Sequence, residues 1–290
     1  MEYFVSMVVL IGIYIILASS FNLIIGFGGL VSIAHPIFYA LGAYTTGLLA
    51  IHFQLHPVLA VMAGGAVAFC SSIMLSLPSL RISGDYLLIT SIGFQLGMLE
   101  IIKHLSFTGG ASGLGNIPNV VEGSSRSAVF AIISCSIAAV VVLIIRWLLN
   151  GPYGRAISAM RDDELAFSAL GRNAMMIKLV LFAIGSGFAG IAGGIYAYYF
   201  QYISPDQFEI MQSAMLLTMV VVGGMGSQMG PVVGAVLLLL LPQAISFMNL
   251  PPSFMASLQG LIFTTLMIVF LFWRPQGLIS PKQHSSSRKA

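Results

Sequence analysis

The sequence predicts an all-α membrane protein: a polytopic transmembrane helical bundle of about eight to ten spans, with helices broken at Gly/Pro-rich segments. Of its 290 residues, 58% are hydrophobic and 7% are charged, whereas a soluble domain carries about 25% charged residues. No charged residue occurs between residues 3 and 80 or between residues 210 and 273. Since about 20 apolar residues cross a bilayer core, each run holds several spans. This pattern excludes a free soluble enzyme and a disulfide-stapled secreted domain.

Charged islands and helix-breaking Gly and Pro residues divide the apolar sequence into candidate helices. We expect spans at residues 4–25, 36–53, 57–77, 85–102, 128–149, 176–200, 213–222, 230–247 and 255–273. Residues 1–281 are predicted to form one transmembrane domain, interrupted by a polar loop at residues 150–175. A short basic tail at residues 282–290 completes the chain.

The orientation in the membrane follows from the lysines and arginines, which are enriched in cytoplasmic loops. These residues gather in an island at residues 146–178 and in the tail after residue 273, so both are predicted to be cytoplasmic. The loop at residues 201–212 carries Asp206 and Glu209 without any Lys or Arg, and is predicted to be external. Counting spans back from the island places the N-terminus outside.

Two glycine-rich breaks share one pattern. Residues 28–36 and 223–231 both read G-G-x-x-S-x-x-x-P, and each lies between apolar runs. This shared pattern arises either by chance in a glycine-rich chain or from a duplicated half, whose orientation is parallel or inverted. Paired Gly/Pro-interrupted segments mark the pathway of many transporters. The predicted orientation puts both breaks on the cytoplasmic side.

Polar side chains within the spans are candidates for lining a solute pathway, because buried polar groups are costly in a bilayer. The candidates are Asn22, Ser32, Thr90, Gln95 and Ser227. The competing interpretation is that Ser and Thr hydroxyls satisfy their own helix backbone. His35, beside the first break, is predicted to be structural.

Residues 154–173 form the one long polar stretch, and they concentrate much of the chain's charge. Their helix-favouring residues predict a helix over 155–170, which Gly171 would end. Ala156, Met160, Phe167 and Leu170 fall roughly along one face of this helix, with Asp163 interrupting the stripe. The helix is either an ordinary solvated loop helix or, as we favour, a docking element for a soluble partner.

This stretch resembles the coupling-loop motif of the permease subunits of branched-chain amino-acid ABC importers, the LivM type, which reads close to G-R-A-x-x-A-x-R-D-x-E-x-A-A-x-x-L-G. Other blocks resemble the same family in the same order along nearly the whole chain. They are Gly28-Gly29 with Ser32, His35 and residues 42–44; residues 80–86; residues 108–114; Pro205, Phe208 and Ser213 with residues 222–231; and residues 274–278.

The resemblance implies a non-catalytic permease in the bacterial cytoplasmic (inner) membrane. Its partners would be a second related permease, two cytoplasmic ATPases, an external substrate-binding protein and the membrane lipid. No cofactor is expected on this chain; ATP and Mg would bind the ATPases, in agreement with the absence of a Walker-type G-x-x-x-x-G-K-[ST] motif. The solute would be a branched-chain amino acid or a related small polar solute. The implied coupling residues are Gly154, Arg155, Met160, Arg161, Asp162, Glu164, Phe167 and Gly171, with Met160 and Phe167 packing on the ATPase.

Two other classes of membrane protein would leave different marks in the sequence. A stand-alone secondary transporter or channel would carry an ionised residue at mid-span, and a haem-binding redox subunit would pair histidines on facing helices. The five histidines fall near predicted span ends or in loops, and no Asp, Glu or Arg falls at mid-span. The net charge of +3 suggests no nucleic-acid partner, and no metal-ligand spacing occurs.

Overall fold

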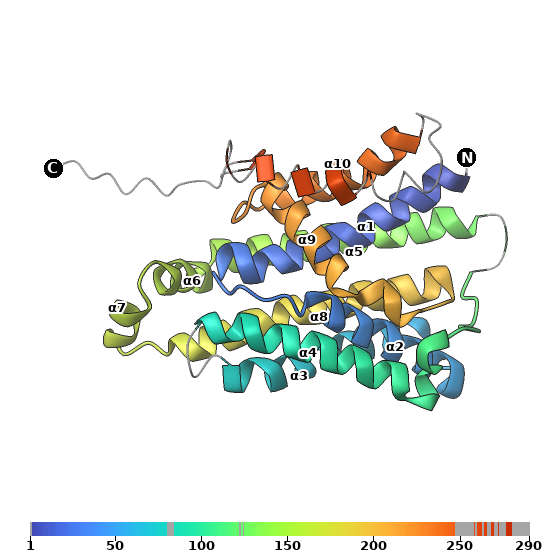
Figure 1. Cartoon of the computed structure of the whole chain (residues 1–290), viewed down its shortest axis with the longest axis horizontal. Helices are drawn as coiled ribbons and strands as arrows, with labels where there is room; N and C mark the ends of the chain where they lie inside the picture. Colours follow the sequence, from blue (N-terminus) through green and yellow to red (C-terminus); the bar gives the residue numbers. More distant parts are fainter. Residues whose placement is uncertain are drawn as a thin grey trace.

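A computed structural model describes residues 2–79, 84–121, 123, 125–246 and isolated positions between 258 and 279. Six of its helices are long and apolar enough to cross a membrane (Figure 1). They are α1 (Glu2–Asn22), α2 (His35–Phe53), α3 (Pro57–Ser79), α4 (Gly84–His104), α5 (Arg126–Asn150) and α8 (Ala174–Phe200). The predicted all-α polytopic bundle is confirmed, and the first six predicted spans agree with these helices within a few residues at each end.

Two shorter apolar helices follow α8. The segments predicted at 213–222 and 230–247 are α9 (Ile210–Gly223) and α10 (Gly230–Ser246), of 14 and 17 residues. At 1.5 Å per residue α9 is about 21 Å long, shorter than a bilayer core of about 30 Å. The predicted span at 255–273 and the basic tail at 282–290 lie outside the described residues, apart from isolated positions.

The centre of the bundle is a close packing of α2, α3 and α8, while α1 packs on α5. Glycines make this approach possible. A Cβ added to Gly42 on α2 would lie 2.1 Å from the carbonyl oxygen of Gly190 on α8, and one on Gly193 would lie 2.1 Å from the Tyr39 oxygen. Small residues at helix interfaces let backbones meet and gain van der Waals contact, which is what holds helices together in lipid.

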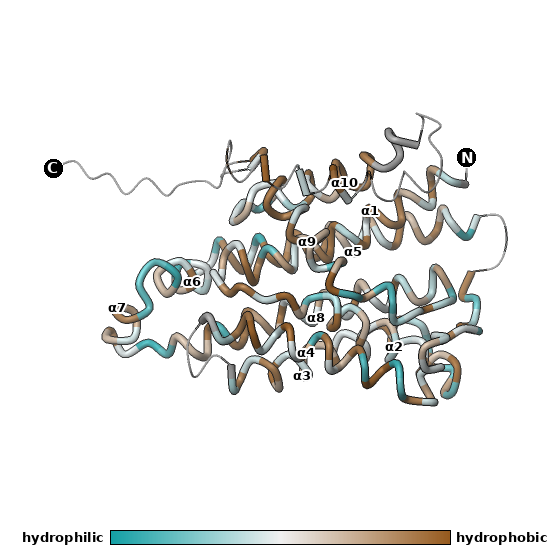
Figure 2. The backbone as a smooth tube through the Cα atoms, viewed as in Figure 1, coloured by the Kyte–Doolittle hydropathy of each residue, from teal (hydrophilic) through white to brown (hydrophobic). Residues whose placement is uncertain are grey.

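Polar segments lie at the two ends of the bundle (Figure 2). One end carries the short helices α6 (Pro152–Asp162) and α7 (Glu164–Ala169). The other end carries the N-terminus, the α4–α5 loop with its 3₁₀ turns at Ser106–Thr108 and Gly110–Ser112, and the 3₁₀ turn η4 (Pro205–Phe208) (Figure 1). The charged helices α6 and α7 and the acidic loop at residues 201–212 therefore lie at opposite ends of the bundle.

Most residues of the first glycine-rich break are buried between helices, whereas Gly29 and Val31 are exposed. After α1 the chain makes a π-helical turn, η1 (Leu23–Phe27), and then runs without helical structure to the start of α2. Here the Ile33 amide donates to the Ser91 hydroxyl on α4 at 3.0 Å, and the Ser213 hydroxyl on α9 donates to the Ile33 carbonyl at 2.6 Å. Side-chain hydroxyls thus satisfy backbone groups that could find no partner in lipid.

Candidate functional site

The polar stretch at residues 154–173 forms two helices rather than the single predicted one. Asp163 has an extended backbone (φ −152°, ψ 100°) between α6 and α7, and its side chain accepts a hydrogen bond from the Ala166 amide at 2.9 Å. Asp is a strong N-cap because its carboxylate satisfies a free helix amide. Gly171 ends α7 as predicted, with a left-handed φ of 77°.

The two residues expected to pack on an ATPase are buried in their own chain, so that part of the prediction is wrong. Met160 is 2% exposed and Phe167 is 6% exposed, and both pack on Ala174 at the start of α8. Helical spacing showed that they share a face, but the fold turns that face toward α8. The Tyr153 hydroxyl also donates to the Ile177 carbonyl of α8 at 3.4 Å, and burial raises the pKa of Tyr153.

Two charged residues of the motif also have partners within this chain. The Lys178 ammonium on α8 lies 2.5 Å from the Glu164 carboxylate, and the Lys178 side chain is only 9% exposed. A guanidinium nitrogen of Arg161 donates to the carbonyl oxygen of Gly26 in η1 at 2.5 Å. Both residues attach α6 and α7 to the bundle and are also exposed at the surface, so their expected contact with a partner protein stays a prediction.

The outward surface of α6 and α7 also carries two large apolar side chains. Leu165 is 85% exposed and Leu170 is 81% exposed, and Arg155 and Asp162 lie exposed on α6. Sequence reasoning missed Leu165. The separate N-cap at Asp163 could have revealed it, because restarting the helix there rotates α7 relative to α6.

The two glycine-rich breaks meet in space. A Cβ on Gly26 would lie 2.6 Å from the Gly226 nitrogen. Asn22 connects them: its amide nitrogen donates to the Ser227 carbonyl at 2.9 Å, and its amide oxygen accepts from the Gly226 amide at 2.9 Å. Helices α1 and α9 therefore both end at this point.

Further contacts complete this junction of breaks. The Ser227 hydroxyl accepts from the Gly230 amide at 2.8 Å, which starts α10. The amides of Leu278 and Ile279 donate to the Val222 and Gly223 carbonyls, the free carbonyls at the end of α9. Arg161 reaches the same place, because a Cβ on Gly226 would lie 3.6 Å from its guanidinium nitrogen. Helix α6 and both breaks therefore converge.

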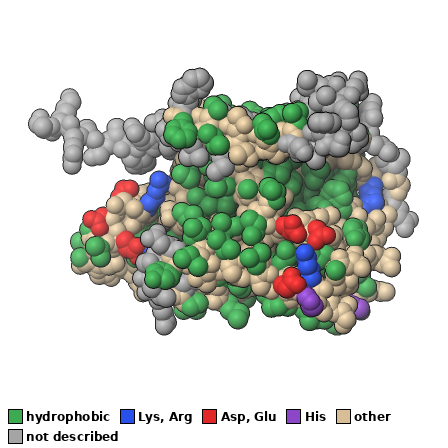
Figure 3. Space-filling model, in the orientation of Figure 1, with side chains coloured by type: hydrophobic (Ala, Val, Ile, Leu, Met, Phe, Trp, Pro, Cys, Tyr) green, Lys and Arg blue, Asp and Glu red, His purple; other side chains and the backbone are tan. Residues whose placement is uncertain are grey.

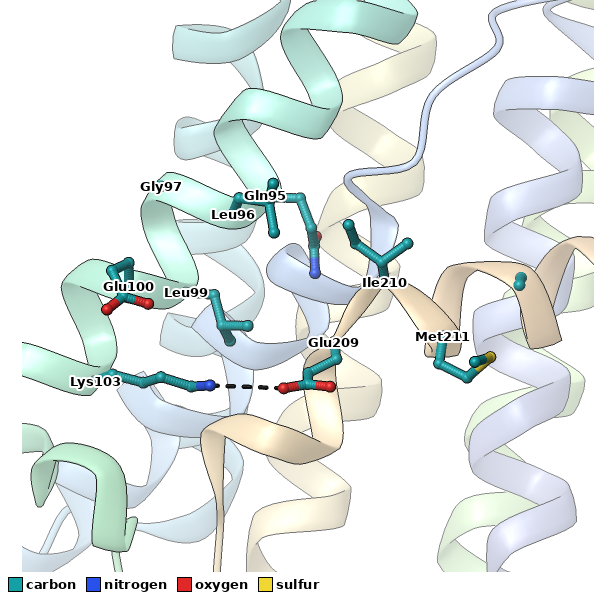
Figure 4. Close-up of a pocket in the computed structure, with 10 residues that line it drawn as sticks. Gln95, Leu96, Gly97, Leu99, Glu100, Lys103, Glu209, Ile210 and Met211 are labelled. Atoms are coloured by element: carbon teal, nitrogen blue, oxygen red, sulfur yellow. Dashed lines mark ion pairs between the residues drawn. The ribbon is translucent and has the colours of Figure 1, made fainter. Parts of the chain in front are cut away.

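A cavity of about 840 Å³ opens near the other end of the bundle, between α4 and α9 (Figure 4). It is lined by Gln95, Leu96, Gly97, Leu99, Glu100, Lys103, Glu209, Ile210, Met211 and Ala214. Figure 3 shows acidic side chains around a lysine on this face, beside a hollow lined by hydrophobic side chains. The Lys103 ammonium lies 3.1 Å from Asp206 and 3.6 Å from Glu209.

Of the predicted pathway residues, only Gln95 lines this cavity. Its amide oxygen accepts from the Ile37 amide at 3.0 Å and its amide nitrogen donates to the Phe208 carbonyl at 2.6 Å. Asn22 and Ser227 lie together at the junction of breaks, and Ser32 accepts from the Ala34 amide at 3.3 Å within the first break. Thr90 is exposed on α4 and donates to the Tyr86 carbonyl of its own helix. Lys103, near the end of α4, also lines this cavity, and sequence reasoning did not identify it there.

The structural role predicted for His35 agrees with its surroundings. Its Nε2 lies 2.9 Å from the Ser20 hydroxyl on α1, and its ring lies 4.9 Å from the Phe21 ring. At 1% exposure it is enclosed at the start of α2 and joins α2 to α1.

Comparison with known proteins gives the family. Residues 3–271 match the family described as the branched-chain amino acid transport system permease component. The chain is 32% identical to the high-affinity branched-chain amino acid transport system permease protein LivM of Salmonella typhimurium, over 92% of this chain and 68% of that protein. It is 29% identical to a probable LivM of Methanocaldococcus jannaschii, over 96% and 94% of the two chains.

It is also 24% identical to the permease protein LivH of Escherichia coli, over 92% and 91% of the two chains. No solved structure matches the chain significantly. With six apolar spans among its described residues and this match over most of its length, the chain is a multi-pass membrane protein that belongs to the branched-chain amino acid transport system permease family, as a LivM-type member.

Proposed function

We propose that this chain is one permease subunit of an ATP-driven importer in the bacterial inner membrane. It would form part of the pathway for a branched-chain amino acid or a related small polar solute. Two cytoplasmic ATPase subunits would bind ATP and Mg and hydrolyse the ATP, while this chain itself is not an enzyme and holds no cofactor. The observation that carries the proposal is the charged α6–α7 pair, which projects from one end of an apolar bundle of this family (Figure 2).

The docking surface would be the outward side of α6 and α7. Leu165 and Leu170 are large apolar side chains with more than four fifths of their surface exposed, next to the charged residues Arg155 and Asp162. Apolar residues surrounded by polar ones are typical of a protein interface. The side of the bundle that carries α6 and α7 would face the cytoplasm, with the C-terminus on the same side.

Transmission from the ATPases would run through Arg161. When the ATPases close, α6 and α7 would shift as a unit, because Met160 and Phe167 pack them together on α8. Arg161 would pass that shift to Gly26, and Asn22 would pass it on to the second break. Irregular backbone between helices absorbs such rigid-body movement at low cost.

A second, related permease would complete the pathway, and an external binding protein would deliver the solute. The relatives of this chain include both LivM and LivH, each named as a permease protein of a branched-chain amino acid transport system. Apolar side chains on α3, α4 and α5 remain exposed in the single chain, among them Met74, Ile89 and Trp147. Lipid and a second permease would cover them.

Co-purification tests the proposal. The chain expressed with its neighbouring transport genes should retain two ATPase subunits through gel filtration in detergent, and Leu165→Asp with Leu170→Asp should release them. Val120→Asp, an exposed apolar residue in the α4–α5 loop at the other end, is the matched control and should retain them. Solute uptake by vesicles that contain only this chain, without ATP, would instead establish the stand-alone transporter.

A further inference from the structure

We propose that the cavity between α4 and α9 is a binding site for a zwitterionic amino acid with a branched apolar side chain. Lys103 would bind the carboxylate, Glu209 would bind the ammonium, and the hydrophobic wall would take the side chain. The choice of solute class rests on the proposed function. The site itself rests on the cavity and its charges.

The wall of the cavity suits an aliphatic side chain. Its lining is mostly apolar, and the apolar members come from both helices: Leu96 and Leu99 from α4, and Ile210, Met211 and Ala214 from α9. Its volume of about 840 Å³ lies within the range of small-molecule sites, which combine an apolar wall with a few polar groups. Figure 4 shows Leu99, Ile210 and Met211 beside the charged pair.

The charged groups select a zwitterion. Lys103 and Glu209 are 3.6 Å apart, farther than Lys103 and Asp206 at 3.1 Å. A zwitterion inserted into this wider ion pair would form two ion pairs in place of one and leave the net charge of the site unchanged. A simple acid bound to Lys103 would leave Glu209 without its partner, and a simple amine bound to Glu209 would leave Lys103 with Asp206 alone.

The location suits a first binding step. The cavity is lined by the C-terminal half of α4 and the start of α9. The C-terminal half of α4 points toward the end of the bundle that carries the N-terminus and η4, away from α6 and α7 (Figure 1). Gln95 in the cavity lining accepts a hydrogen bond from the Ile37 amide in the first turn of α2. A solute that moves Gln95 would therefore shift the start of α2. The turn η1, which precedes α2 in the chain, is hydrogen-bonded to Arg161 of α6.

Binding to the purified permease complex in detergent tests the site. L-leucine should bind by isothermal titration or saturation-transfer NMR, whereas isocaproate, which lacks the ammonium, and isoamylamine, which lacks the carboxylate, should bind at least tenfold more weakly. Lys103→Met and Glu209→Gln should each weaken leucine at least tenfold. Arg172→Gln, which removes an exposed charge in the loop between α7 and α8 and outside the cavity lining, is the control and should change affinity less than twofold.

The exchanged variant Lys103→Glu with Glu209→Lys keeps both charges and should recover at least part of the affinity. Unchanged leucine affinity in both single variants, or isocaproate binding as tight as leucine, would overturn the site. Failure of the site is distinct from failure of the proposed function. If the complex retains its ATPases but does not bind leucine in the cavity, only the proposed binding site is contradicted. If the chain binds leucine in the cavity but has no ATPase partner, only the proposed importer function is contradicted.

Discussion

Arg161 of α6 donates a hydrogen bond to the carbonyl of Gly26, in the turn where α1 ends, 135 positions away in the sequence. A guanidinium presents several donors in a rigid plane, so this residue holds α6 directly against the turn that leads into the first break. Asn22, one turn before Gly26, then binds the second break. The charged loop and the two glycine-rich segments are thus one connected structure, and their connection can be tested residue by residue.

Arg161→Gln is expected to lower solute uptake per ATP hydrolysed at least fivefold, because movement of α6 no longer reaches Gly26. Arg161→Lys should recover little, since a single ammonium on a flexible stem does not reproduce the planar donor set. Uptake and ATP hydrolysis measured together in proteoliposomes give the ratio. Arg172→Gln, in the loop between α7 and α8, removes a charge nearby and should leave the ratio unchanged. An Arg161→Gln importer with normal coupling would contradict the linkage.

Asn22→Leu removes both hydrogen bonds between the breaks. At about 0.5–1.5 kcal/mol for each bond, it should lower the free energy of unfolding by about 1–3 kcal/mol and lower the melting temperature in detergent. Thr90→Val is the control, because the exposed Thr90 hydroxyl bonds only its own helix. If Asn22 instead lined the pathway without holding the breaks, solute preference would change while the melting temperature stayed constant.

Glu164→Gln leaves the Lys178 ammonium, whose side chain is 9% exposed, without a carboxylate. A buried charge that loses its partner costs about 1–3 kcal/mol, so thermal unfolding should shift to lower temperature. Adding Lys178→Met to the same chain removes the uncompensated charge and should restore most of the stability. A double variant that is as unstable as the single one would show that the ion pair is not the cause.

Gly42→Ala places a Cβ 2.1 Å from the Gly190 oxygen, which forces α2 and α8 apart. We expect lower yield and a lower melting temperature, because tight helix contact is the main source of stability in lipid. Gly93→Ala is the matched control: nothing lies within 4 Å of a Cβ at that position on α4. The control should be neutral or stabilising by up to about 1 kcal/mol, since Ala favours helix over Gly. Equal effects from the two would rule out the packing explanation.

The sequence alone predicted the helices well, because span length and hydrophobicity are local properties that the bilayer dictates. The start of α9 differs from the prediction by three residues, and Gly171 ends α7 as expected. The candidate site was predicted less completely. Met160 and Phe167 of the predicted stripe pack together against α8, whereas Leu170, which was predicted on the same face, is exposed together with Leu165.

The sequence by itself determined that this is a helical membrane permease with a charged loop and two glycine-rich breaks, since composition, spacing and motif need no knowledge of neighbours. Only the tertiary structure decided which groups meet. Arg161 with Gly26, Asn22 with Ser227, and Lys103 with Asp206 are each pairs separated by more than 100 residues. Such pairs depend on how whole helices pack, because the side chains follow the backbone that carries them.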